Sequence, residues 1–383
     1  MTVEIMTVDM PTGPFIRPTV RARGKVFWAR FLRAVGVLRV SRKWVQRQGA
    51  VVLTFHRILT DEELELTASL PGMIVRCETF DGFLKYAVET CQFVQLPVEP
   101  EWKQNQRLKV AITFDDGWLD NASSACPIAQ KHQAPMAIFV VPERTGTVLP
   151  FWPERAASAL DRQMSAADRA QNRNYVEQTI ERLKGLSAQE RKRRIDEMTS
   201  SGGVLHSTAL VDQTMTWEQI AELHNSGVTF GSHTSTHEIL TGIPPAQAQD
   251  EISLSRELIE QRLDTPCSIF SYPNGDFSPM VRELVARAGY KFAFLNQDPG
   301  VWTPRSDPYL IPRVNVCEYH LVDDKGKFSP LMFDYAVVWN AAKGLLAEKR
   351  AGFLRRLRSK FHGWSVKFHL QSAEKSHVEK SSL

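Results

Sequence analysis

Val110-Ala-Ile-Thr-Phe-Asp-Asp-Gly117 joins a short run of apolar and β-branched residues directly to two adjacent carboxylates and a glycine. Such a run, ended by a turn signal, predicts a strand that is buried on both faces, as in a parallel sheet. Asp115 and Asp116 would then stand at the carboxyl end of that strand, where α/β barrel enzymes carry their reactive groups. Taken alone, the Asp-Asp-Gly segment also fits a plain turn that closes the strand.

Strand and helix patterns alternate on both sides of this segment, which predicts an α/β fold with a parallel sheet. The segment 152–210 differs, because it is rich in Arg, Glu, Ala and Gln and predicts polar helices inserted into the fold. Further strands are predicted at 48–55, 136–141, 228–231, 267–271, 292–294 and 309–314, and helices at 23–47, 79–91, 118–132, 216–226, 244–263 and 279–288.

Two more segments that could take part in binding or catalysis follow predicted strands. GSHTSTH (residues 231–237) places His233 and His237 four residues apart, so that both imidazoles can reach one ion. Together with the paired carboxylates they predict a His₂Asp site for a divalent metal, with the open positions typical of a catalytic ion. FSYPNGD (residues 270–276) is a turn held by proline and glycine, which could offer backbone N–H groups to an oxyanion or be structural only.

These three segments, in this order and each after a strand, resemble the motifs of the NodB-homology polysaccharide deacetylases, carbohydrate esterase family 4. The resemblance extends over about residues 50–315. SYPNGDF, WEQIAEL…GVTFGSH and LIPR resemble most closely the bacterial exopolysaccharide branch of the family. The resemblance implies a deformed (β/α) barrel and an enzyme that removes acetyl groups from N-acetylated sugars.

The resemblance also implies roles by position. A TFDDG motif in the family supplies the catalytic base, here Asp115, and one metal ligand. The ligands of one divalent ion, with Zn²⁺ as the expected metal, would be Asp116, His233 and His237. The third motif builds the wall of the substrate groove and contains Tyr272; in it Asn274 falls where the family offers a backbone N–H to the oxyanion.

Departures from the family pattern leave two points open: which residue holds the base in place, and which residue is the general acid. Ser271 stands where an arginine usually opens the third motif, and Arg313 either replaces that arginine or forms a structural ion pair. The family's Asp-Trp motif and its C-terminal Leu-x-x-His have no clear counterpart. In permuted members the acid comes from an N-terminal strand, so His56 is the candidate acid unless it is a core histidine. His320 is the alternative.

Composition restricts the class of protein. The chain has 383 residues, of which 43% are hydrophobic and 23% charged, as in soluble globular proteins. No run approaches the roughly 18 apolar residues of a transmembrane helix, and the acid-containing N-terminus does not resemble a secretory signal. Five widely spaced cysteines without a CxxC pair argue against a disulfide framework or a cysteine zinc site. We therefore expect a cytoplasmic protein.

The net charge of +4 conceals two strongly basic ends. Residues 11–50 contain ten basic residues and residues 349–367 contain seven, with no acid in either segment, while the rest has 30 basic and 43 acidic residues. Both 23–47 and 353–367 combine arginines with apolar residues at helical spacing, the pattern of a helix that lies in an anionic membrane interface. The alternative is that the apolar faces pack on the barrel. No nucleic-acid partner is expected.

The sequence thus predicts a basic tail and amphipathic helix at 1–48, a deacetylase barrel at 49–320 and a basic helical extension at 321–383. The predicted substrate is an N-acetylated polysaccharide, oligosaccharide or lipid-linked glycan, reached from the cytoplasm or from the inner face of the membrane. Two alternatives stay open: hydrolysis of a non-sugar amide or an O-acetyl ester, and a non-catalytic, membrane-associated role in glycan assembly.

Overall fold

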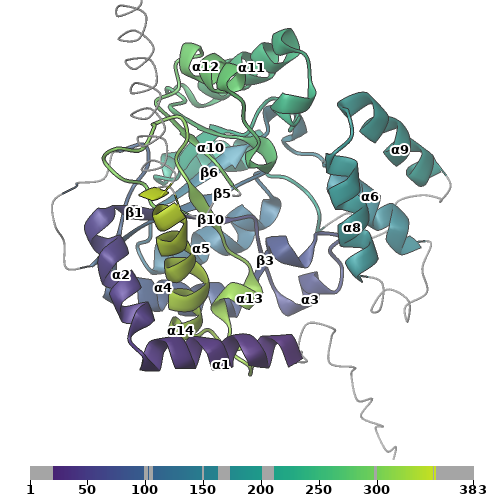
Figure 1. Ribbon diagram of the computed structural model, residues 1–383. Helices are drawn as coiled ribbons and strands as arrows, with labels where there is room; N and C mark the ends of the chain where they lie inside the picture. Colours follow the sequence, from purple (N-terminus) through teal and green to yellow (C-terminus); the bar gives the residue numbers. More distant parts are fainter. Residues whose placement is uncertain are drawn as a thin grey trace, which may run out of the picture.

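The computed structural model describes residues 20–98, 102, 107–148, 151–162, 173–200, 211–296, 300–347 and 349–350. Its main strands are β1 (Ala50–Phe55), β5 (Leu108–Phe114), β6 (Met136–Val140), β7 (Thr229–Ser232), β8 (Ile269–Ser271), β9 (Phe292–Phe294) and β10 (Arg313–Asn315). Within the described residues they form one parallel sheet in the order β10-β1-β5-β6-β7-β8-β9, and β4 (Cys91–Phe93) pairs beside the start of β5 (Figure 1).

The two ends of this sheet meet. Phe294 of β9 forms a parallel bridge with Ile311, just before β10, and the N–H of Leu295 donates to the carbonyl of Ile311 at 2.9 Å. The predicted deformed (β/α) barrel is therefore confirmed. Ala293 completes this junction, because its N–H donates to the carbonyl of Pro308 at 2.8 Å and its carbonyl accepts from the N–H of Ile311 at 2.9 Å.

The strands are apolar on both faces because each face meets a different core. Successive residues of a strand point to opposite sides, so Val51 and Leu53 of β1 join the large core under the helices. Ala50 and Val52 join the smaller cluster that fills the barrel together with Phe139 of β6. This double burial explains the unbroken apolar runs of the sequence.

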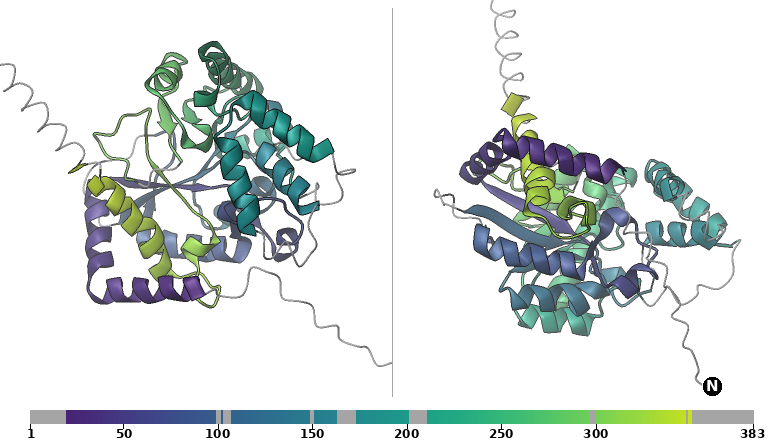
Figure 2. Two further views of the ribbon diagram at one scale, coloured as in Figure 1. Left: turned by 45° about the vertical axis from the view of Figure 1, so that its right-hand side comes forward. Right: turned by 90° about the horizontal axis from the view of Figure 1, so that it is seen from below.

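Helices surround the barrel (Figure 2). The predicted helix at 118–132 begins at Leu119 and continues through the π-helical turn η2 (Asn121–Ala125) into α5 (Cys126–Lys131). α10 (Trp217–Asn225) begins at a Thr216 capping box and α12 (Pro279–Arg287) at a Ser278 cap. The other helices of this layer are α4 (Cys77–Thr90) and α11 (Pro245–Leu263).

The basic N-terminal segment forms two helices where one was predicted. α1 (Val20–Ala34) and α2 (Val37–Gln48) are separated at Gly36, whose φ of 81° is accessible to glycine at low cost. Val26 and Ala29 of α1 pack on Met332 of α14 (Pro330–Phe333). Beyond α14 the chain stays helical through η7 (Asp334–Val338) to residue 347, and the predicted helix at 353–367 lies outside the described residues.

The predicted polar helices of the insertion are α6 (Trp152–Arg162), α8 (Arg173–Lys184) and α9 (Ala188–Ser200), which stand beside the barrel (Figure 1). They share a small apolar core of their own that includes Leu160 and Ile180. Among the described residues, no helix combines the length and the apolarity that crossing a membrane requires.

Candidate metal and catalytic site

The three chemical motifs meet at the carboxyl ends of β5, β7 and β8. Four of the six described non-glycine residues with positive φ lie in the loops that follow these strands: Asp116, Thr234, His237 and Asn274, with φ between 58° and 74°. Such backbone conformations cost free energy in residues with a Cβ atom, and they gather where a site requires a particular side-chain direction. Gly117, with φ of 74°, completes the turn after Asp116.

Asp116, His233 and His237 form a compact cluster in which the three potential ligand atoms lie within 4.8 Å of one another. Asp116 Oδ1 is 3.3 Å from His237 Nε2 and 3.6 Å from His233 Nε2. The structure thus brings together the three residues that the sequence singled out as metal ligands, although they come from two strands.

Neighbouring groups orient these side chains. His233 directs Nδ1 to the carbonyl oxygen of Ser271 at 2.8 Å, which leaves Nε2 for the cluster. The indole N–H of Trp118 donates to Asp116 Oδ2 at 3.0 Å, which leaves Oδ1 on the side of the histidines. Hydrogen bonds of this kind fix the ring orientation and basicity of metal ligands.

Burial and mutual charge set the ionisation of the cluster. Burial lowers the pKa of His233 to about 4, so its imidazole is neutral at pH 7, the form that can ligate a metal. Burial alone would raise the pKa of Asp116, but the hydrogen bond and charge of His237 outweigh it and hold that pKa below its usual range. One carboxylate and two imidazoles with free Nε2 atoms fit a divalent ion of the zinc type.

Asp115 points to a different partner. Arg313 of β10 donates Nη1 to Asp115 Oδ1 at 2.8 Å and Nη2 to Oδ2 at 2.6 Å, and both side chains are fully buried. Ser271 lies 3.4 Å from the same Oδ2. Burial would raise the pKa of Asp115, but the charges of Arg313 and His233 lower it, so the carboxylate is ionised. Arg313 thus forms an ion pair with Asp115, as considered for it from the sequence.

His56 lies at the same site, between β1 and β2 (Arg57–Leu59). It is 8% exposed, its Nδ1 has no hydrogen-bond partner among the described residues, and its charge acts on both Asp115 and Asp116. His320 has other neighbours: its Nδ1 lies 3.5 Å from Cys317 Sγ, and burial followed by the charge of Lys25 lowers its pKa to about 4. The geometry favours His56 as the acid.

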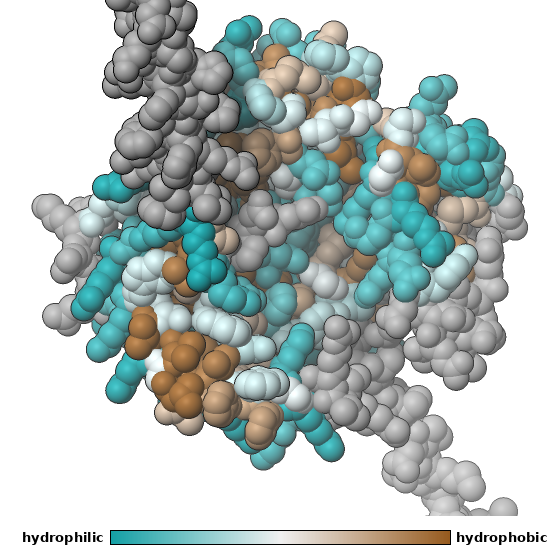
Figure 3. Space-filling view, viewed as in Figure 1, coloured by the Kyte–Doolittle hydropathy of each residue, from teal (hydrophilic) through white to brown (hydrophobic). Residues whose placement is uncertain are grey.

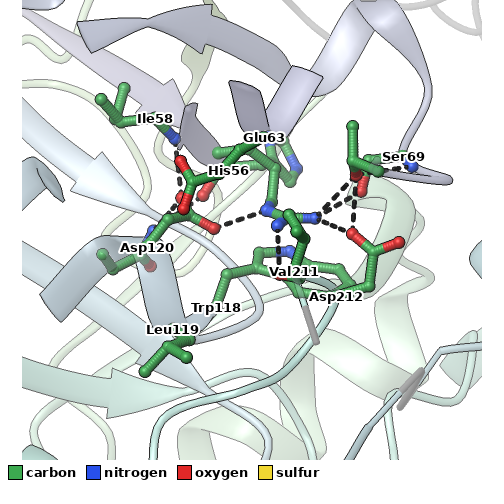
Figure 4. A network of polar contacts seen from close by, with 12 residues as sticks. His56, Ile58, Glu63, Ser69, Trp118, Leu119, Asp120, Val211 and Asp212 are labelled. Carbon is green, nitrogen blue, oxygen red and sulfur yellow. Dashed lines mark hydrogen bonds and ion pairs between the residues drawn. The ribbon is translucent and has the colours of Figure 1, made fainter. Parts of the chain in front are cut away.

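A buried network supports the loop of His56 (Figure 4). Arg57 donates Nε to Asp120 at 2.6 Å and Nη1 to Asp212 at 2.8 Å, and its guanidinium lies 4.2 Å from the ring centre of Trp118. Asn121 donates to the backbone carbonyl of His56 at 2.9 Å. Trp118 contacts both Arg57 in this network and Asp116 in the metal cluster, so the two groups of residues are connected.

The third motif contributes its backbone more than its side chains. Tyr272 is fully buried in the large core and donates its hydroxyl to the carbonyl of Tyr309 at 3.0 Å, so its ring does not face a groove. Asn274 adopts φ of 58° in the following turn and donates its side-chain amide to Asp276 at 2.8 Å. Its backbone N–H makes no hydrogen bond to another described residue, as an oxyanion donor requires.

Sequence reasoning did not identify several residues of this site. Trp118 follows the Asp-Asp-Gly turn directly, and Arg57 follows His56, so adjacency to a motif could have pointed to both. Phe151 and Glu154 carry no comparable signal. The Phe151 ring packs 4.9 Å from that of His237, and Glu154 is buried close enough to Asp116 for their charges to interact.

Comparison with known proteins places these motifs in a family. Residues 103–293 match the family model of polysaccharide deacetylases. A Bacillus subtilis (strain 168) protein named "Putative polysaccharide deacetylase YxkH" is 29% identical over 207 residues, which are 54% of this chain and 51% of that protein. The chain therefore spans about half the length of this curated relative. His56 and Arg313 lie outside the range that the family model matches.

Solved structures are similar at lower identity. The Streptococcus pyogenes deacetylase PplD, in complex with acetate, aligns with a TM-score of 0.47 and 18% identity over 74% of this chain and 99% of that chain. IcaB from Ammonifex degensii aligns with a TM-score of 0.46 and 16% identity over 77% of this chain and 97% of that chain.

Proposed function

Through residues 103–293 the chain carries a domain of the polysaccharide deacetylase family, and on that premise we propose that it is a metal-dependent N-deacetylase of an acetylated glycan. It would hydrolyse the acetamide of an N-acetylated sugar to acetate and a free amine. The observation that carries the proposal is the position of an ionised, non-ligating carboxylate, Asp115, beside the cluster of Asp116, His233 and His237.

Asp116, His233 and His237 would hold one divalent ion, for which we propose Zn²⁺. When bound, the ion would act as a Lewis acid towards the acetyl carbonyl and the attacking water. The protein supplies the direction of each ligand, through Trp118 on Asp116 and the Ser271 carbonyl on His233. The backbone N–H of Asn274 would donate to the oxyanion that develops on the acetyl group.

Asp115 would act as the general base and take a proton from the attacking water. Its Oδ2 lies 3.9 Å from His233 Nε2, on the side of the cluster, while Arg313 holds both oxygens in a fixed fork. A carboxylate so held stays ionised at neutral pH and keeps one orientation. His56 would protonate the nitrogen as the C–N bond breaks, because a neutral amine leaves more readily than the anion R–NH⁻ that would otherwise form.

The test is acetate release by the metal-loaded full chain from N-acetylglucosamine oligomers and from lipid-linked N-acetylated glycans. Asp115→Asn should reduce the rate about 10²–10⁴-fold, the usual contribution of general acid–base catalysis, with metal content unchanged. Asp250→Asn, an exposed aspartate on α11, is the matched control and should leave the rate unchanged. A panel of O-acetyl sugars and non-sugar amides separates the alternative substrates, and no release from any N-acetylated sugar would refute the proposal.

We also propose that the protein is cytoplasmic and attaches to the inner, anionic face of the membrane through α1. Its aromatic residues remain uncovered although Val26 and Ala29 pack on α14: the exposed fractions are 66% for Phe27, 55% for Trp28 and 48% for Phe31. An apolar patch lies over α1 in Figure 3. Aromatics beside arginines, with no acid in the segment, suit an anionic bilayer interface.

Co-sedimentation of the full chain with anionic and neutral vesicles at low and high salt tests this attachment. We expect pelleting with anionic vesicles that is weakened by salt and by Trp28→Ala/Phe31→Ala. Leu254→Ala removes an apolar side chain of similar exposure, 50%, from α11 and should have no effect. Absence of pelleting with anionic vesicles at low salt would contradict the proposal.

A further inference from the structure

Both ends of the helical insertion reach the metal and catalytic cluster. At the first end, the Phe151 ring lies 4.9 Å from that of His237 and 5.0 Å from that of Trp118. At the other end, Asp212 binds Arg57 beside His56. Arg191 of α9 forms a 2.7 Å ion pair with Glu238, the residue after His237. The insertion is therefore built into the wall of the site.

Glu154 lies in the first turn of α6, and its contacts with other described residues do not explain why its carboxyl group is buried. Its side chain is 2% exposed, and its Oε1 is buried without a hydrogen-bond partner among the described residues. The nearest charges act on it unfavourably: burial first, and then the carboxylates of Asp116 and Asp212, together raise the pKa of Glu154 to about 8. The cation that acts on it, Arg57, is already engaged by Asp120 and Asp212.

An oxygen buried in this way costs folding free energy unless another molecule supplies its partner. The surroundings restrict what that partner can be. An anion would be repelled by the carboxylates of Asp116 and Asp212, whereas a neutral hydroxyl group can donate to Oε1 without carrying charge into the site. An N-acetylated sugar carries such hydroxyl groups beside its acetamide.

We propose that Glu154 binds a hydroxyl group of the sugar whose acetyl group is removed, and that the insertion thereby contributes to substrate selection. This rests on the proposed function, because it assigns a contact to the same substrate. Glu154 is a binding residue here: it takes no part in moving the proton that Asp115 accepts. It would explain why α6 is anchored against the metal ligands.

Calorimetric binding of an N-acetylglucosamine tetramer to the metal-loaded Asp115→Asn protein tests the contact without turnover. Adding Glu154→Leu should weaken binding about tenfold, as expected for the loss of one hydrogen bond. Glu154→Gln keeps the shape and an acceptor oxygen and should stay within about threefold of the parent. Glu177→Leu, an exposed glutamate of α8, is the matched control and should bind as the parent does.

A thermal melt of each variant separates binding from folding. Glu154→Leu should melt no lower than the parent, because it removes a buried oxygen without a partner. Unchanged affinity of Glu154→Leu would overturn the proposal, as would failure of the protein with Glu154 intact to bind the tetramer. Tetramer binding without acetate release when Asp115 is intact would instead overturn the proposed function and leave the Glu154 contact standing.

Discussion

Replacing Arg313 with methionine should destabilise the protein by about 3–5 kcal/mol, because it leaves the carboxylate of Asp115 buried without its counter-charge. Asp115 and Arg313 are both fully buried, and the two hydrogen bonds between them are 2.8 and 2.6 Å long. Methionine is of similar length to the arginine stem and brings no charge or donor, so the change isolates the guanidinium.

The size of the loss follows from the hydrogen bonds of Arg313. Besides Asp115, the guanidinium donates to the carbonyl of Leu295 at 2.8 Å, to the Ser271 hydroxyl at 2.7 Å and to the Thr113 hydroxyl at 3.1 Å. Hydrogen bonds to a charged group contribute about 1.5–3 kcal/mol each, and a carboxylate left unpaired adds its own desolvation penalty. Removing the charge of Asp115 as well should recover at least about 2 kcal/mol, because no unpaired ion remains.

The assay is urea unfolding, followed by tryptophan fluorescence, of the parent, Arg313→Met, Asp115→Asn and the double variant. The four free energies of unfolding form a double-mutant cycle that gives the coupling between the two side chains. Arg313→Lys should be intermediate, because an ammonium group keeps the charge and loses the fork. Purely additive losses, or a loss below about 1 kcal/mol for Arg313→Met, would refute the pairing as described.

Four further outcomes are expected. His233→Ala and His237→Ala should each lose most of their bound metal in elemental analysis, and full retention in both would exclude the proposed ligand set. His56→Ala should slow cleavage of an amide far more than cleavage of an activated acetyl ester, whose leaving group needs no proton, so equal losses would indicate a structural role. Arg57→Met should cost about 3–5 kcal/mol in urea unfolding, because two buried carboxylates lose their shared cation. The pKa of Glu154 is about 8 in the folded protein against 4.5 for an unperturbed glutamate, so the native state binds the extra proton between these pH values. Stability should therefore fall as pH rises through this window, by at most about 1.4 kcal/mol per pH unit, and Glu154→Gln should remove that part of the slope in thermal melts.

The metal ligands could be predicted from the sequence because each motif is local. Asp116 follows a predicted apolar strand within two residues, and His233 and His237 stand four residues apart after another predicted strand. Because parallel strands end at the same edge of a sheet, this pattern places all three residues at that edge. The parallel sheet followed from the alternation of strands and helices, and the barrel from the resemblance to the NodB-homology family. These inferences required only neighbours in sequence.

The remaining site depends on contacts between distant segments. Arg313 and Asp115 are 198 residues apart, and the pairing of β10 with β1, which itself pairs with β5, brings the guanidinium to Asp115. Glu154 is buried by the packing of α6 on the barrel, which no periodicity in the chain indicates. Tyr272 directly follows β8 and packs into the large core, and the motif did not specify in which direction its ring would point.

The place of Arg313 on the last strand makes the order of synthesis matter. A chain released from the ribosome before residue 313 would already contain Asp115, Asp116, His233 and His237, yet the base would have no fork to hold it. β10 completes the wall beside β1, the first strand made, so the two ends of the barrel must find each other before the base is supported. Under the proposed mechanism, nascent or truncated forms would lack a correctly held base, and hydrolysis would begin only once the final strand is in place.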